Sequence, residues 1–487
     1  MPRRLARVLS LFTTLAVAPP AFAGDWLAAT PDAMIAVEAR AVRRADADAL
    51  AHLLLIHRLA DRAAAGASRQ ALVALGSQPA EVGMAARWLA RTLEPDGLEP
   101  LALPPRYDEP EAPEGNLRSW AILGPFEDTG AGLERQEGPE TEGHRFVGAD
   151  YSWGVYAVRP QRSLPATVTG RGLPLDLYVF PGQESCAYLS TLVTLSGTAT
   201  FHIASSGSLR VIWDGRTVLT DDAPHERAIV DRAAFTANGA SGRHELTLKV
   251  CRGARADEGR VRVHVTDGAG APLALTATSS LEALDEARAA GPAPSRVERH
   301  PTLLERSVAG SDPLRAARAP GLLDQLVNAP GVTTEDLALA GWLTSFVANR
   351  SGWLERALQS ARDAKDDAVA SFAQRALVET RLELGSLDLA RVTASAAPLH
   401  AETDPEAVWL RAALDAAEGG AGLANKAETA LAAIVAREGE ATPVVVWDAI
   451  ADEAGERPAV ALAARARLAR HAPGRADIYF LNAFSML

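Results

Sequence analysis

The spacing of apolar residues changes twice along the chain, and these changes limit the folds that it can adopt. Residues 24–94 are rich in alanine and follow a helical pattern, whereas apolar residues alternate with period two from about 120 to 265. From about residue 280 onward the helical pattern returns. Alternation of this kind indicates strands with one buried face. We therefore predict a multidomain α+β protein with helices on either side of a β-rich domain.

Prolines and turn residues set the boundaries of these regions. Six prolines between residues 94 and 115 disfavour regular structure, so 95–114 is predicted to be a linker after an N-terminal helical region at 24–94. Asp214-Gly215 is a typical hairpin turn, because glycine adopts positive φ easily. Several short strands separated by turns favour an antiparallel, jelly-roll-like β-sandwich at 115–275.

The helices predicted at 280–487 contain a repeat. Three glycines, spaced 37 and 33 residues apart, each precede an alanine near the start of the next helix: Gly385 with Ala390, Gly422 with Ala427, and Gly455 with Ala461. This pattern resembles the tetratricopeptide repeat, a helix pair of about 34 residues with small residues where its helices cross. The resemblance implies a C-terminal α-solenoid of helix pairs whose surface binds a protein or peptide. An alanine-rich helical array without true repeats is the alternative.

The β-rich domain resembles two families of sandwich modules. The likeness rests on Trp120 to Phe126, on the strand and hairpin from Leu209 to Gly215, and on Gly242 to Cys251. These stretches are similar to the galactose-binding-like and protective-antigen-like modules, in many of which ligands bind at loops or on one sheet face. Together with the helical repeats, they also resemble the N-terminal half of large exported bacterial transglutaminase-like proteins. The catalytic Cys, His and Asp of that family have no counterpart in this sequence.

The first 23 residues have the parts of a cleavable export signal. Three arginines are followed by a largely apolar stretch from Val8 to Ala18, and small residues precede a cleavage point after Ala23. This stretch is too short to span a bilayer as a helix, which takes roughly 20 residues. We expect a mature protein that is periplasmic or extracellular, with no integral membrane segment.

The net charge and the motifs of the sequence argue against several classes of function. The formal net charge is −12, and removing the signal takes away only basic residues, which argues against nucleic acid as a partner. The sequence contains no phosphate-binding loop, serine-hydrolase elbow or paired-histidine zinc motif. We therefore predict no enzymatic activity and no cofactor.

Four residues of the β-rich domain are candidates for ligand binding: Arg210, Trp213, Asp214 and Asp231. An arginine and a tryptophan suit a sugar-type site, although Trp213 shares a strand face with apolar neighbours and is expected in the core. Asp214 and Asp231 offer oxygen ligands, but their spacing is not that of a calcium loop, so no metal is predicted.

Strand parity places Cys186, Cys251, His202 and His264 on faces that point away from the apolar core. Whether the cysteines form a disulfide stays open, because they meet only if their strands are neighbours. An oxidising compartment after export would permit the bridge. The histidines are expected to be exposed.

These patterns predict an exported, non-catalytic binding or scaffold protein. Its helical repeats would bind a protein or peptide, and its sandwich a cell-wall or other glycan. The alternative is an accessory N-terminal part of a carbohydrate-active or transglutaminase-like enzyme whose catalytic domain is missing from this chain.

Overall fold

The computed structural model describes two compact units. It covers residues 31–43, 49–78, 80–93, 115–154, 156–168, 172–253, 257, 259–303, 305–306, 327–328, 332–344, 347–395, 405–417, 421–453 and 463–464. The described residues up to 93 and from 303 onward form the helical unit, and those from 115 to 302 form the sandwich unit. The predicted signal peptide, the predicted linker at 95–114 and the repeat at Gly455 lie outside the described residues.

The helical unit is assembled from two segments that the whole sandwich unit separates in sequence. Its first segment contains α3 (Pro31–Arg43), α4 (Ala49–Arg58), α5 (Ala67–Leu75) and α6 (Ala80–Thr92). The Ala65 amide donates to the Ala441 carbonyl at 3.2 Å, which joins this segment to the second one. Arg62 forms an ion pair with Glu379 and lies over the ring of Trp342, 5.6 Å from its centroid. The N-terminal helices therefore share one unit with the C-terminal helices.

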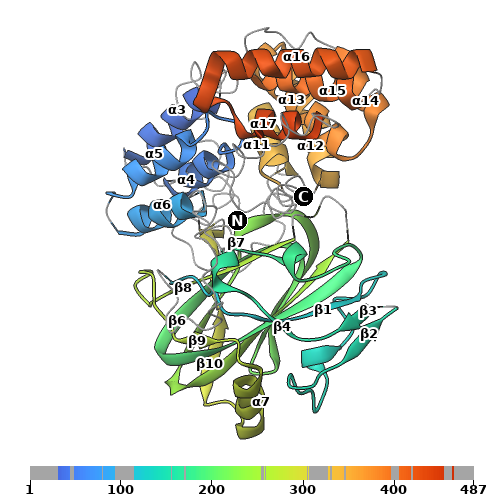
Figure 1. Cartoon of the computed structure of the whole chain (residues 1–487). Helices are drawn as coiled ribbons and strands as arrows, with labels where there is room; N and C mark the ends of the chain where they lie inside the picture. Colours follow the sequence, from blue (N-terminus) through green and yellow to red (C-terminus); the bar gives the residue numbers. More distant parts are fainter. Residues whose placement is uncertain are drawn as a thin grey trace. The chain divides into compact units, whose positions relative to one another are not determined.

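The second segment of the helical unit is a series of helices that pack against their neighbours in sequence (Figure 1). These are α11 (Thr334–Leu343), α12 (Val347–Ala364), α13 (Asp367–Glu383), α14 (Leu387–Ser395), α15 (Pro405–Ala417), α16 (Ala421–Glu438) and α17 (Val444–Glu453). Gly385 lies between α13 and α14 with φ +66°, and Ala390 is buried in α14, as the repeat pattern predicts. Gly422 differs, because it lies inside the first turn of α16.

The sandwich unit is built on two long strands that each contribute to both of its layers (Figure 1). Its strands are β1 (Ala121–Glu127), β2 (Tyr151–Trp153), β3 (Tyr156–Val158), β4 (Gln161–Arg162), β5 (Leu173–Pro174), β6 (Ser185–Trp213), β7 (Arg216–Arg252), β8 (Arg260–Thr266), β9 (Ala277–Thr278) and β10 (Ser295–Arg299). In the first layer, residues 185–195 and 208–213 of β6 flank residues 242–252 of β7. In the second, residues 197–205 of β6 lie between residues 233–239 of β7 and β8. The helix α7 (Leu281–Ala290) follows these layers.

Inward-facing side chains of both layers form one apolar core. Phe201 and Phe235 of the second layer stack with centroids 4.8 Å apart, and Trp213 of the first layer packs against both. The alternation that predicts Leu189 and Leu248 on the inward face is confirmed, since both are fully buried in this core. The mixed α+β class with an antiparallel sandwich and C-terminal helices is therefore confirmed.

The expectation of exposed histidines on the outward faces is wrong. His202 and His264 lie opposite each other on β6 and β8, and each is at most 5% exposed. His202 Nδ1 lies 2.8 Å from a carboxylate oxygen of Asp231, and Nε2 lies 3.1 Å from the Thr266 hydroxyl. Parity assigns a side chain to one face of a sheet, but it does not tell whether other parts of the chain cover that face.

The described part of the chain has no helix with both the length and the apolarity needed to cross a bilayer.

Candidate ligand-binding site

A cavity of about 370 Å³ lies on the outer face of the first layer, beside the turn between β6 and β7. The turn forms as predicted, because Asp214 and Gly215 both have positive φ, at +52° and +74°. We call this cavity the hairpin pocket. Its lining residues are Gln136, Pro139, Glu140, Thr141, Glu142, Ile212, Asp214, Gly215, Thr217, Arg243, Glu245, Ala287, Arg288 and Pro292. The sheet, the segment 136–142 and α7 with the residues after it therefore all contribute to one concave site.

One charge pair in the pocket joins the sheet to α7. The Arg288 guanidinium donates twice to the Glu245 carboxylate, from Nε at 2.7 Å and from Nη2 at 2.6 Å. Such bidentate pairs fix both side chains more firmly than a single contact does. Asp285, one turn earlier on α7, accepts from the Phe146 and Val147 amides at 2.7 and 3.0 Å. These contacts hold α7 against the sheet and against residues 146 and 147.

A second cluster of charges lies behind the pocket around Glu140. Its Oε1 accepts from Arg210 Nη1 at 2.9 Å, and its Oε2 accepts from Lys249 Nζ at 3.1 Å and from the Tyr188 hydroxyl at 2.5 Å. Lys249 is fully buried, and burial lowers the pKa of its ammonium group. Burial, together with the hydrogen bond to Glu140, raises the pKa of the Tyr188 hydroxyl. Buried charges of this kind persist only when they are paired, so this cluster is a fixed arrangement.

Asp214 has its carboxylate fixed as well. Oδ1 accepts from the Glu245 amide at 2.9 Å, and Oδ2 lies 2.7 Å from His244 Nδ1. Burial raises the pKa of Asp214, although the hydrogen bonds from His244 and Glu245 act in the opposite direction. The charges of Glu140, Asp214 and Glu245 are therefore all engaged within the chain.

The four residues selected from the sequence fall in three places. Asp214 lines the hairpin pocket, and Arg210 lies behind it as a partner of Glu140. Trp213 is in the apolar core, as its strand face indicates, so its assignment as a ligand-binding residue is corrected. Asp231 is buried beside His202 in the second layer and does not line the pocket. The four residues selected from the sequence therefore do not meet at one site in the structure.

Sequence reasoning missed Glu140, Glu245 and Arg288. Strand alternation contains a signal for Glu245, because Leu246 and Leu248 face inward and the residue directly before Leu246 must therefore face outward. No signal distinguishes Glu140 from the other acids of its loop or Arg288 from the other arginines of its helix. Their roles depend on contacts between residues far apart in sequence.

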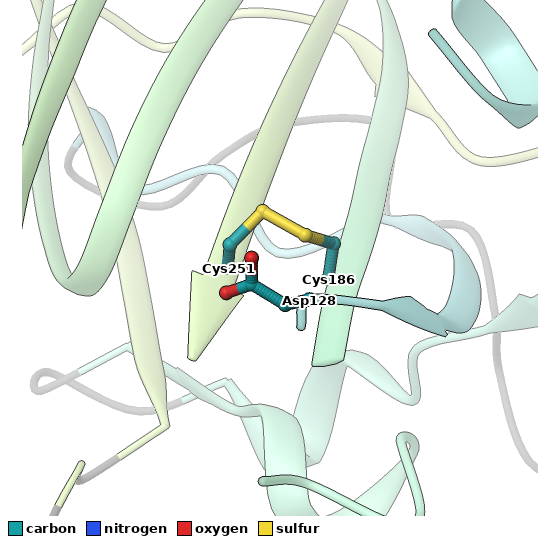
Figure 2. A group of neighbouring side chains, drawn as sticks. All are labelled: Asp128, Cys186 and Cys251. Carbon is teal, nitrogen blue, oxygen red and sulfur yellow. A yellow bond between two sulfur atoms is a disulfide. The ribbon is translucent and has the colours of Figure 1, made fainter. Parts of the chain in front are cut away.

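The question left open about the cysteines is settled by the register of the strands. Cys186 and Cys251 lie directly opposite each other on β6 and β7 and form a disulfide with an S–S distance of 2.03 Å. Figure 2 shows the Asp128 side chain beside this bond. Burial raises the pKa of Asp128, although the Gly132 amide donates to its carboxylate at 3.0 Å. The two sulfur atoms are bonded to each other, so they are not thiolate ligands for a metal ion.

A second, smaller cavity of about 220 Å³ lies in the helical unit between α15 and α16. We call it the helix groove. It combines apolar side chains with three charged ones, and its lining residues are Val408, Arg411, Ala412, Asp415, Ala430, Ala433, Ile434 and Arg437.

No family model matches the chain, and no curated protein matches it. A solved structure of a TPR-domain containing protein from Parabacteroides distasonis ATCC 8503 is similar in part, with 11% sequence identity and a TM-score of 0.24. The match covers 62% of this chain and 65% of the length of that protein. A similarity of this size carries no argument about function.

Proposed function

We propose that this chain is an exported, non-catalytic binding protein whose hairpin pocket takes a neutral, polyhydroxylated ligand such as a sugar unit of a glycan. The single observation that supports this proposal is the set of fixed charged side chains in the pocket, above all the bidentate pair of Glu245 and Arg288. Such groups are ready to exchange hydrogen bonds with several hydroxyl groups at once without first being ordered.

Three carboxylates of the pocket favour a neutral ligand over an ionic one, while Glu142 and Arg243 also line it and are exposed. Glu140, Asp214 and Glu245 are engaged by Arg210, His244 and Arg288. A charged ligand would gain most by breaking one of these pairs, which leaves a poorly solvated charge behind. The described lining contains no aromatic side chain, so recognition would depend on hydrogen bonds and not on ring stacking.

A glycan array probed with the full chain tests this proposal. We expect saturable binding to a subset of neutral glycans, and Arg288→Ala is expected to weaken it at least about tenfold, because a lost charged hydrogen bond costs about 1.5–3 kcal/mol. Arg296→Ala is the matched control, since Arg296 is an exposed arginine on β10 outside the pocket lining. Equal binding by both variants, or no glycan bound at all, would count against the sugar site.

The helix groove supports a second candidate function, the binding of a peptide segment by the helical unit. Arg411 and Arg437 line the groove together with one acid, Asp415, and otherwise apolar residues. Two arginines against one acid suit an extended peptide with an acidic side chain or a terminal carboxylate. Panning a peptide library against the full chain tests this candidate. We expect enrichment of acidic peptides, and loss of that enrichment in Arg437→Glu but not in Arg391→Glu, which changes an exposed arginine of α14.

Export to the periplasm or beyond is part of the same proposal, and the buried disulfide supports it because such bonds persist in oxidising compartments. Intact mass of the protein recovered from its native host tests it, with Gly24 expected as the first residue. An accessory role beside a carbohydrate-active or transglutaminase-like catalytic domain is the alternative to an independent binding protein. Enzymatic activity that copurifies with the native protein would favour that alternative.

A further inference from the structure

One column of side chains on the outer face of the first layer extends from the disulfide towards the sheet residues that line the hairpin pocket. In this column Cys186 pairs with Cys251, Tyr188 with Lys249, and Ser190 with Thr247. The Ser190 and Thr247 hydroxyls lie 2.6 Å apart, and the Thr247 hydroxyl donates to the Glu245 carboxylate at 2.8 Å. The disulfide and the lining residue Glu245, which pairs with Leu192, therefore belong to one run of successive cross-strand pairs on the same face of the sheet.

The segment that forms the pocket wall is held down on this column. Lys249 Nζ donates to the Leu133 carbonyl at 3.3 Å and also to the Arg135 carbonyl. Glu140, which lines the pocket, accepts from both members of the Tyr188 and Lys249 pair. Three of these five residues belong to the covering segment, and the other two belong to the sheet. The wall thus depends on the sheet for its position.

We propose that Glu140 is a positioning residue whose hydrogen bonds hold segment 131–142 against the sheet, so that this segment forms a wall of the hairpin pocket. We call this set of hydrogen bonds the latch. The disulfide keeps β6 and β7, the strands of Tyr188 and Lys249, in register. The latch is chemically specific, because one carboxylate accepts from a phenol, an ammonium and a guanidinium group. This inference rests on the proposed function only for its effect on ligand binding. The position of the wall can be measured without a ligand.

Amide hydrogen exchange of the full chain without ligand tests the latch directly. Glu140→Ala is expected to raise exchange in segment 131–142 at least about tenfold, while the amides of 246–250 in the sheet keep their wild-type rates. Glu140→Gln retains one acceptor oxygen and is expected to recover part of the protection. Glu286→Gln, at an exposed glutamate of α7, is the matched control and is expected to exchange as the wild type does. Wild-type exchange in Glu140→Ala would overturn the proposal.

Two further variants keep the test decisive if Glu140→Ala does not fold. Tyr188→Phe removes a hydroxyl that donates to Glu140 and also accepts from the Glu137 amide, so it is expected to raise exchange at residues of segment 131–142 other than Glu137 by a smaller factor. The double variant Cys186→Ala/Cys251→Ala is expected to raise it as well, together with exchange at the flanking residues of β6 and β7. Unchanged protection of the segment in Tyr188→Phe would contradict the role assigned to Glu140.

Ligand binding is a second measurement, and its result distinguishes a failure of this inference from a failure of the proposed function. If a sugar binds, Glu140→Ala is expected to raise its Kd at least about tenfold, and Glu140→Gln less. If no sugar binds but segment 131–142 still loosens in Glu140→Ala, the proposed function fails and the latch stands. If a sugar binds with equal Kd to wild type and Glu140→Ala, the latch does not shape the pocket and the inference fails.

Discussion

The sandwich unit and the helical unit stabilise their folds in different ways. The sandwich buries the charged groups of Lys249 and Arg252 and fixes each with carboxylate partners, and a disulfide joins its two long strands. Much of the helical unit's core is instead alanine and leucine. Buried polar networks hold side chains in one arrangement, because any unpaired member is costly. Close packing of small residues instead allows helices to approach each other. The fixed charge pairs of the hairpin pocket are part of such a polar network.

The two units also differ in how far apart in sequence their contacts lie. Helices from α11 onward pack mainly on their neighbours in sequence, while β6 and β7 combine segments of both layers. Yet the helical unit includes one long-range junction, where α3 to α6 and their connections meet the C-terminal helices. Variants that remove a contact between distant segments, or one between neighbouring helices, test whether the two units differ in this way.

The largest effect is expected from removing the disulfide. Cys186→Ala/Cys251→Ala releases a loop of 65 residues, and the loop-entropy model assigns about 4 kcal/mol of unfolding free energy to such a closure. We expect this loss in the sandwich unit, with little change in the helical unit. Urea unfolding monitored by hydrogen exchange for each unit is the measurement. An equal loss of stability in both units would show that they unfold together.

The junction within the helical unit is expected to have the next largest effect. Arg62→Met removes the ion pair with Glu379 and leaves a largely buried carboxylate without that partner, at a cost of about 2–3 kcal/mol. The exposed pair of Arg391 and Asp388 is the control, and Arg391→Met is expected to change stability by less than about 0.5 kcal/mol. Thermal unfolding of both variants is the comparison. Similar melting temperatures for the two would mean that the N-terminal helices contribute little to this unit.

Close helix packing makes a smaller, local prediction. A Cβ on Gly341 would lie 2.8 Å from Cγ of Leu354 on the neighbouring helix, so Gly341→Ala is expected to cost about 1–2 kcal/mol. Gly352 has open space around its Cα, and Gly352→Ala is expected to stabilise the helix by about 0.5–1 kcal/mol. Opposite shifts in denaturant midpoint would support the packing of α11 on α12. Stabilisation by both changes would contradict it.

The last prediction concerns the acid stability of the sandwich unit, where the effect is absent at neutral pH and grows only as the pH falls. Burial, and secondly the nearby Arg288, lower the pKa of His144 to about 4 from 6.5. Above pH 6.5 the folded and unfolded chains both hold a neutral imidazole, but between pH 6.5 and 4 only the unfolded chain gains a proton. Stability is therefore lost as the pH falls through this window, by at most about 1.4 kcal/mol per pH unit.

His144→Gln isolates this contribution, because the other titrating groups stay the same. We expect the variant to lose less unfolding free energy than the wild type between pH 7 and pH 5. Parallel pH profiles for the two proteins would show that His144 titrates normally in the folded chain.

Local sequence patterns predicted local structure well and long-range contacts poorly. Period-two alternation identified the inward face of Leu189 and Leu248, and the Asp214-Gly215 dipeptide identified its turn. Glu140 and Arg288 were missed, since their partners Lys249 and Glu245 are distant in sequence. A sequence shows which residue types are available for a charge pair. Which of them meet depends on strand register and on the segments that cover each sheet.

The most direct test of a ligand site on the sandwich is hydrogen exchange of the full chain with and without a neutral sugar that the array selects. We predict that the sugar slows exchange in residues 136–142, 212–217 and 243–245, which surround the hairpin pocket. Exchange in α15 and α16 is predicted to stay unchanged. Protection confined to α15 and α16, or no protection around the hairpin pocket, would contradict the assignment of the site to the sandwich.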